Sequence, residues 1–170
     1  MKRLLCVVAM SAGLGACATT TSNAPKASAE LAPTSGNNAR GTVTFVQEGD
    51  KVALTAKVSG LAPGAHGFHI HEKGDCSSGD GMSAGGHFNP AGKSHGSLTT
   101  EHHAGDMPNI TADASGNATV SGEVPGLTIG GGAADIVGKG LIVHRDPDDY
   151  RSQPAGNAGP RIACAVIRKA

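Results

Sequence analysis

Several histidines and one aspartate are the side chains of this chain that are best suited to bind metal ions. His69 and His71 lie two positions apart in an apolar segment. On a β-strand, side chains at positions i and i+2 point to the same face, so both rings could reach one ion. Imidazole nitrogens bind copper and zinc well, whereas a carboxylate suits zinc better than copper. The other candidate ligands follow along the chain: His87, His95, His103, Asp106 and His144.

The number of these candidate ligands predicts two metal ions that share one residue. Seven ligands cannot complete two separate four-coordinate sites. A histidine can be shared, because each of its two ring nitrogens can bind a different metal. Of the remaining histidines, we expect His66 to be a structural hydrogen-bonding residue beneath the strand, and His102 to face solvent or to bind adventitious metal.

Short strands and turns must position these ligands, because no segment carries the apolar stripe of a helix. The chain has 26 glycines and no tryptophan, a composition that favours turns and small cores. Residues 41–46 and 52–58 form a predicted hairpin around the turn at 48–50. Many short strands predict an all-β antiparallel sandwich or barrel with long, functional loops. The other expected strands are residues 67–71, 109–112, 118–124, 140–144 and 162–167.

The start of the chain is predicted to direct export. Residues 1–16 combine a basic beginning with an apolar run that is too short to span a bilayer, as in a signal peptide. The sequence Leu-Gly-Ala-Cys at positions 14–17 resembles a bacterial lipobox, which predicts a lipidated Cys17. An ordinary secretory cleavage beside Cys17 is the alternative. Ala18 after the cysteine favours a lipoprotein of the outer membrane that faces the periplasm.

The composition also predicts where folding begins and which partners are excluded. Residues 17–39 are poor in large apolar side chains, so we expect a lipidated cysteine followed by a flexible tether. The folded domain is expected to span residues 40–170. The formal net charge is zero, which argues against wholesale binding to nucleic acid. The predicted membrane partner therefore involves only the N-terminal lipid anchor.

Three motifs resemble the copper/zinc superoxide dismutase family. They are Gly-Phe-His-Ile-His at 67–71, Gly-His-Phe-Asn-Pro at 86–90, and Gly-Asn-Ala-Gly-Pro-Arg-Ile-Ala-Cys at 156–164. The resemblance implies an eight-stranded Greek-key β-barrel, with one copper and one zinc ion per subunit, that converts superoxide into oxygen and hydrogen peroxide. It implies copper ligation by His69, His71, His87 and His144, and zinc ligation by His87, His95, His103 and Asp106.

The resemblance also assigns roles around the two metals. His87 is the implied bridge, and its ring is expected to take up a proton that helps to form peroxide. Arg161 is the implied docking site for the superoxide anion, since a guanidinium is permanently charged. Asp148 is expected to hydrogen-bond one copper histidine and one zinc histidine, with Asp146 and Asp149 as nearby competitors. Only His103, and not His102, has the family's spacing to Asp106.

Cys76 and Cys164 are the cysteines that remain after the leader and Cys17. Export to an oxidising compartment favours a disulfide, and the resemblance implies that it joins the loop after His71 to the last strand. Two alternatives stay open at this point: a periplasmic protein that buffers copper or zinc without turnover, and a copper-only dismutase. A complete zinc ligand set argues against the second. The resemblance is compatible with a homodimer but identifies no interface.

Overall fold

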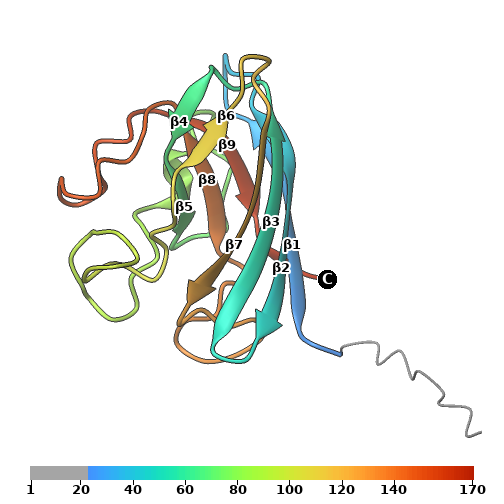
Figure 1. The fold of residues 1–170 in the computed structure, drawn as a ribbon, viewed down its shortest axis with the longest axis vertical. Helices are drawn as coiled ribbons and strands as arrows, with labels where there is room; N and C mark the ends of the chain where they lie inside the picture. The colour runs from blue at the N-terminus through green and yellow to red at the C-terminus, as the bar shows by residue number, and fades with distance from the viewer. Residues whose placement is uncertain (1–22) are drawn as a thin grey trace, which may run out of the picture.

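The computed structural model describes residues 23–170, and this part of the chain is built from short β-strands. All of the strands expected from the sequence are present, with boundaries that differ by a few residues. In chain order the strands are β1 Lys26–Pro33, β2 Arg40–Glu48, β3 Lys51–Ser59, β4 Gly64–His66, β5 Phe68–His71, β6 Ile110–Ala112, β7 Ala118–Pro125, β8 Gly140–His144, β9 Arg161–Val166 and β10 Arg168–Lys169 (Figure 1). The helical content of residues 23–170 is one 3₁₀ turn, η1 Met82–Ala84.

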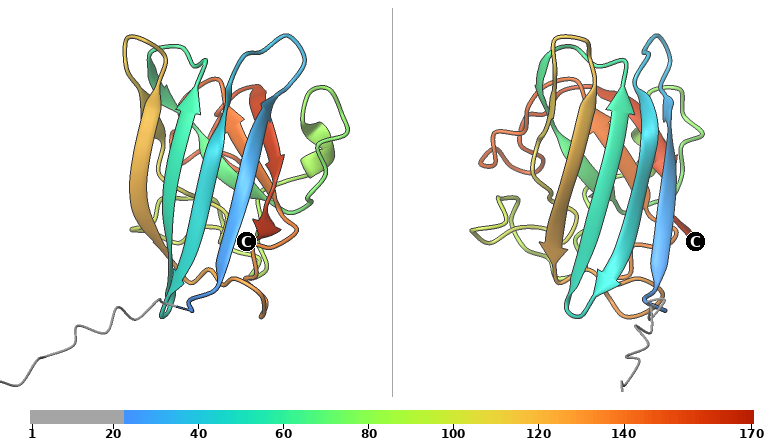
Figure 2. Two further views of the ribbon diagram at one scale, coloured as in Figure 1. Left: turned by 90° about the vertical axis from the view of Figure 1, so that its right-hand side faces the viewer. Right: turned by 45° about the vertical axis from the view of Figure 1, so that its right-hand side comes forward.

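The strands form one large antiparallel sheet and one small one. The large sheet has eight strands in the order β5-β8-β9-β1-β2-β3-β7, with β10 also paired to β1, and β4 pairs with β6. Figure 2 shows β1, β2, β3 and β7 as one curved layer, with β8 and β9 crossing behind it. The chain therefore has the predicted all-β class, with a curled antiparallel sheet consistent with a Greek-key barrel.

The core lies between the layers and follows the alternation of each strand. In β2, Val43 and Phe45 are fully buried, while the alternating Thr42 and Thr44 are exposed. In β5 all four residues are buried: Phe68 and Ile70 join the hydrophobic core, while the two histidines point to the other face. Removing apolar surface from water stabilises such a layered core.

The first strand corrects the expected tether of residues 17–39. Residues 26–33 form β1, which pairs with β2 on one side and with β9 and β10 on the other. Ala27, Ala29 and Leu31 of this strand are buried in the core. The folded part therefore begins by Lys26 and not near Arg40, because backbone pairing on both sides holds a strand of small side chains in place.

The predicted signal peptide, residues 1–16, and Cys17 lie outside the described residues. Within residues 23–170 there is no helix with the length and apolarity needed to cross a membrane.

Two long connections extend from the sheet. Residues 72–109 link β5 to β6 and contain η1, and residues 145–160 link β8 to β9. The later part of the first connection and the second connection project to the same side of the sheet (Figure 1). Loops held on a rigid sheet are a common location for binding and catalytic side chains.

Candidate metal centre

Strands β5 and β8 supply three of the predicted copper ligands. His69 and His71 alternate with core residues on β5, so both rings leave the sheet on the same face. Strand β8 is the antiparallel neighbour of β5 and ends at His144. The ring centroids of His69 and His144 lie 5.0 Å apart.

Backbone hydrogen bonds hold the loop segments that carry His87 and Asp106 against β5. The N–H of Ile70 donates to the carbonyl of Gly105 at 2.9 Å, and the N–H of Phe88 donates to the carbonyl of Ile70 at 2.8 Å. These bonds place His87 and Asp106 directly beside the strand. Gly105 has to be a glycine, because a Cβ there would overlap the Ile70 carbonyl oxygen. Two loop segments thus act as short extra strands that position ligands.

All seven predicted ligands come together in two overlapping groups. Within each group the candidate ligand atoms lie within 4.8 Å of one another, and His87 belongs to both. The first group contains His69, His71, His87 and His144, and the second contains His87, His95, His103 and Asp106. Every member is buried.

Unpaired ring nitrogens indicate where ions would bind. Within residues 23–170, six buried side-chain nitrogens have no hydrogen-bond partner: His69 Nδ1, His71 Nε2, His87 Nε2, His95 Nδ1, His103 Nδ1 and His144 Nε2. A buried polar atom without a partner costs free energy unless something else satisfies it. All six belong to predicted ligands, and none belongs to His66 or His102. The donor set therefore fits copper and zinc, which imidazole nitrogens bind well.

The opposite ring nitrogens are fixed by the protein. His71 Nδ1 lies 2.9 Å from the Gly85 carbonyl oxygen, and His144 Nδ1 lies 3.0 Å from the Gly159 carbonyl oxygen. Because a carbonyl oxygen only accepts hydrogen bonds, each of these Nδ1 atoms carries the ring proton. Nε2 of the same ring therefore has a free lone pair that can bind a metal ion. His87 Nδ1 instead lies 2.7 Å from Asp106 Oδ1, on the side of the second group.

Burial and hydrogen bonds keep four of the predicted ligands in their metal-binding protonation states. Burial lowers the pKa of His69 to about 4 and the pKa of His144 to about 3, and it holds the pKa of His71 well below its ordinary value. Burial would raise the pKa of Asp106, but hydrogen bonds from His87 and from two backbone N–H groups outweigh it and hold that pKa far below its usual range. Neutral rings and an ionised carboxylate are the forms that bind metals.

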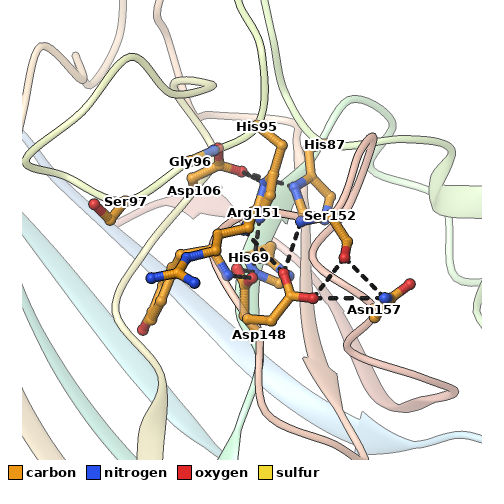
Figure 3. A network of polar contacts seen from close by, with 12 residues as sticks. His69, His87, His95, Gly96, Ser97, Asp106, Asp148, Arg151, Ser152 and Asn157 are labelled. Atoms are coloured by element: carbon orange, nitrogen blue, oxygen red, sulfur yellow. Dashed lines mark hydrogen bonds and ion pairs between the residues drawn. The ribbon is translucent and has the colours of Figure 1, made fainter.

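Asp148 connects the two groups as predicted. Its Oδ2 accepts a hydrogen bond from His69 Nε2 at 2.7 Å, and its Oδ1 accepts one from His95 Nε2 at 2.9 Å. Figure 3 shows its carboxylate between these two rings. The competitors lie elsewhere: Asp146 pairs with Arg145, and Asp149 accepts bonds within its own loop.

Arg161 stands directly opposite His144 in the β8–β9 pair. Its half-buried guanidinium donates to the carbonyls of Gly81 at 2.8 Å and Gly85 at 2.5 Å. The Gly85 carbonyl also accepts from His71, so one oxygen orients both a predicted copper ligand and the predicted anion-docking group. The sequence offers no signal for this carbonyl, because its role depends on where the loop folds.

The predicted disulfide is present. Cys76 and Cys164 are joined, with their Cα atoms 5.9 Å apart. Cys164 lies three residues after Arg161 on β9. The bond therefore ties the loop that supplies the Gly81 and Gly85 carbonyls to the strand that carries the arginine.

The two remaining histidines lie outside both groups. The ring nitrogens of His66 lie 2.9 and 2.8 Å from the carbonyl oxygens of His144 and Ala62, which confirms its structural role. The expectation that His102 faces solvent is only partly right: the residue is partly buried, and its Nδ1 lies 2.6 Å from the carbonyl oxygen of His103. Sequence reasoning missed Asn109, whose side-chain amide pairs with both backbone groups of Asp148. No sequence motif singles this residue out.

Comparisons with known proteins agree with this geometry. Residues 39–167 match the family described as copper/zinc superoxide dismutase (SODC), so β1 precedes the matched region. The chain is also 46% identical over 149 residues to "Superoxide dismutase [Cu-Zn] 2" of Aquifex aeolicus (strain VF5), which covers 84% of this chain and 86% of the relative. The chain therefore belongs to the copper/zinc superoxide dismutase family, whose enzymes require copper and zinc and act on superoxide.

Proposed function

We propose that this enzyme performs dismutation at a copper site and a zinc site that share the ring of His87. The observation that carries the proposal is the set of six buried ring nitrogens without hydrogen-bond partners. The copper site would use His69, His71, His87 and His144, and the zinc site would use His87, His95, His103 and Asp106. Bound copper supplies one-electron redox chemistry, whereas zinc has none.

The shared ring is the central feature of this proposal. His87 Nε2 faces the first group and Nδ1 faces Asp106, so one side chain offers a nitrogen to each site. The ring of His87 is also the group placed to hold a proton at Nε2 and pass it to the product. Asp148 holds the rings of His69 and His95 in the tautomers that expose Nδ1.

Arg161 is proposed to dock the substrate anion. Its two bonds to loop carbonyls hold the guanidinium in place without neutralising its charge, since a carbonyl is a dipole and not an anion. A permanent cation opposite His144 would attract a small anion such as superoxide to the copper side of the centre.

We further propose that the enzyme protects the cell envelope as a lipoprotein of the periplasm, anchored to the outer membrane at Cys17 after removal of residues 1–16. The Cys76–Cys164 disulfide supports an oxidising compartment. Cys17→Ala should move the protein from the membrane fraction to the soluble periplasmic fraction, and unchanged fractionation would contradict the anchor. A homodimer stays a prediction.

The shared site is tested by metal analysis together with a superoxide assay. The purified enzyme should contain about one copper and one zinc ion per chain, as two four-ligand sites require. His87→Ala should lower the affinity for both metals and abolish most of the activity. A variant that keeps a fully loaded zinc site would reject the bridge, and a fully metallated enzyme without activity would reject the function.

A further inference from the structure

A side-chain amide outside the ligand set holds the backbone of one predicted zinc ligand. Gln153 Oε1 accepts the backbone N–H of His95 at 2.9 Å, and Gln153 Nε2 donates to the His95 carbonyl, also at 2.9 Å. One side chain thus satisfies both backbone groups of His95, as a neighbouring strand would. His95 needs such a partner, because it lies in a loop whose preceding residues, 91–94, are all exposed.

The segment that carries Gln153 contacts His95 in two further places. The Asp148 carboxylate accepts from the His95 ring at 2.9 Å. Gly156 packs so closely that a Cβ there would overlap the Asp148 carboxylate and crowd the His95 ring. The other ring nitrogen, Nδ1, has no hydrogen-bond partner and lies 3.0 Å from Oδ1 of Asp106, a second predicted zinc ligand. Backbone and ring of His95 are therefore both fixed by the connection between β8 and β9.

A second side-chain amide holds the backbone of Asp148, which contacts the His95 ring, in the same way. Asn109 Oδ1 accepts the backbone N–H of Asp148 at 2.9 Å, and Asn109 Nδ2 donates to the Asp148 carbonyl at 3.0 Å. His95 and Asp148 are thus each held by a carboxamide that comes from the opposite loop. Two reciprocal pairs of this kind fix the relative position of the two loops at the zinc side of the centre.

We propose that Gln153 is a positioning residue for zinc, which acts by holding the backbone of His95 so that Nδ1 faces the zinc position. This proposal rests on the zinc assignment of the proposed function. An amide is required because it provides an acceptor and a donor on the same group, whereas leucine provides neither. Gln153 is mostly exposed, so its replacement leaves no cavity in the core.

The test is zinc binding by the full-length chain with Gln153→Leu and Gln153→Asn. The shorter asparagine keeps the amide but lacks the reach for both bonds, and it serves if the leucine variant does not fold. Zinc affinity, measured by competition with a chromophoric chelator, should fall about 10–100-fold, as for other groups that orient metal ligands. Cobalt(II) bound in place of zinc should show a changed visible spectrum, and copper affinity should fall less than zinc affinity.

Gln47→Leu is the matched control. The Gln47 amide donates to the carbonyls of Gly49, Lys51 and Leu127 and accepts the N–H of Ile129, so it fixes a loop without touching the centre. This control should lower the unfolding midpoint and leave zinc affinity unchanged. An equal loss of zinc affinity in the control would overturn the proposal, because zinc binding would then follow stability alone.

His95→Ala distinguishes a wrong zinc assignment from a wrong role for Gln153. If His95→Ala binds zinc as tightly as the unmodified chain, the zinc assignment itself is wrong. If His95→Ala loses zinc but both Gln153 variants keep full zinc affinity and an unchanged cobalt spectrum, only the role of Gln153 is rejected.

Discussion

Replacing Asp148 by asparagine tests how one buried carboxylate orients both halves of the centre. Oδ1 accepts from His95 Nε2 at 2.9 Å and from the backbone N–H of Tyr150 at 2.7 Å, while Oδ2 accepts from His69 Nε2 at 2.7 Å. An asparagine has one accepting oxygen and one NH₂ group, so it cannot accept all three bonds. Keeping its oxygen where two donors converge preserves more bonds, so the NH₂ group should face His69.

This orientation predicts an unequal effect on the two metals. An N–H that faces His69 Nε2 makes this nitrogen an acceptor and moves the ring proton to Nδ1. His69 Nδ1 is the unpaired nitrogen assigned to copper. A hydrogen bond to a charged group contributes about 1.5–3 kcal/mol, so copper affinity should fall about 10–100-fold. Zinc affinity should fall less, because His95 keeps its acceptor.

Separate competition titrations with copper and zinc measure this difference. Asp146→Asn is the matched control, since Asp146 pairs with Arg145 on the surface and touches no ligand ring. The control should leave both affinities unchanged. Equal losses for both metals, or a loss confined to zinc, would refute the tautomer argument. Unchanged binding of both metals would refute the orienting role of Asp148.

Three further predictions concern substrate docking, the disulfide and pH. Arg161→Ala should slow turnover while copper content stays unchanged in elemental analysis, and lost copper would contradict a docking role. Replacing Cys76 and Cys164 by serine should lower the free energy of unfolding by about 2–5 kcal/mol in a denaturant titration, because a long loop is then no longer closed; an unchanged value would contradict this. In the metal-free protein, His69 becomes protonated at a higher pH in the unfolded chain than in the folded chain, because burial lowers its folded pKa to about 4. Stability should therefore fall as the pH drops from about 6.5 to 4, with a loss of about 3 kcal/mol from this ring, and no loss in that window would reject the assignment.

The ligand set could be predicted from the sequence because each ligand lies in a distinctive local context. The spacing of His69 and His71 on a strand, and the apolar run that ends at His144, are visible without a structure. The count of seven candidate ligands predicted a shared histidine. The structure places all of them in two groups that overlap at His87.

The first strand could not be predicted from composition. Ala27 and Ala29 bury little apolar area, so residues 26–33 resemble a linker when considered alone. Strand β1 is stabilised by its neighbours, which lie both next to it and near the end of the chain. Because these partners lie in other segments, the sequence of β1 shows only a weak alternation of apolar and polar residues.

By itself, the sequence determined the strand class, the ligand types, the cysteine pair and the family, because local alternation and motif spacing carry this information. The tertiary structure decided which backbone and side-chain groups hold the ligands. The Gly85 carbonyl, the Asn109 amide and the Gln153 amide act on residues 14 to 76 positions away. Any chain segment offers carbonyls and amides, so only the folded arrangement of the two loops selects those that orient the metal centre.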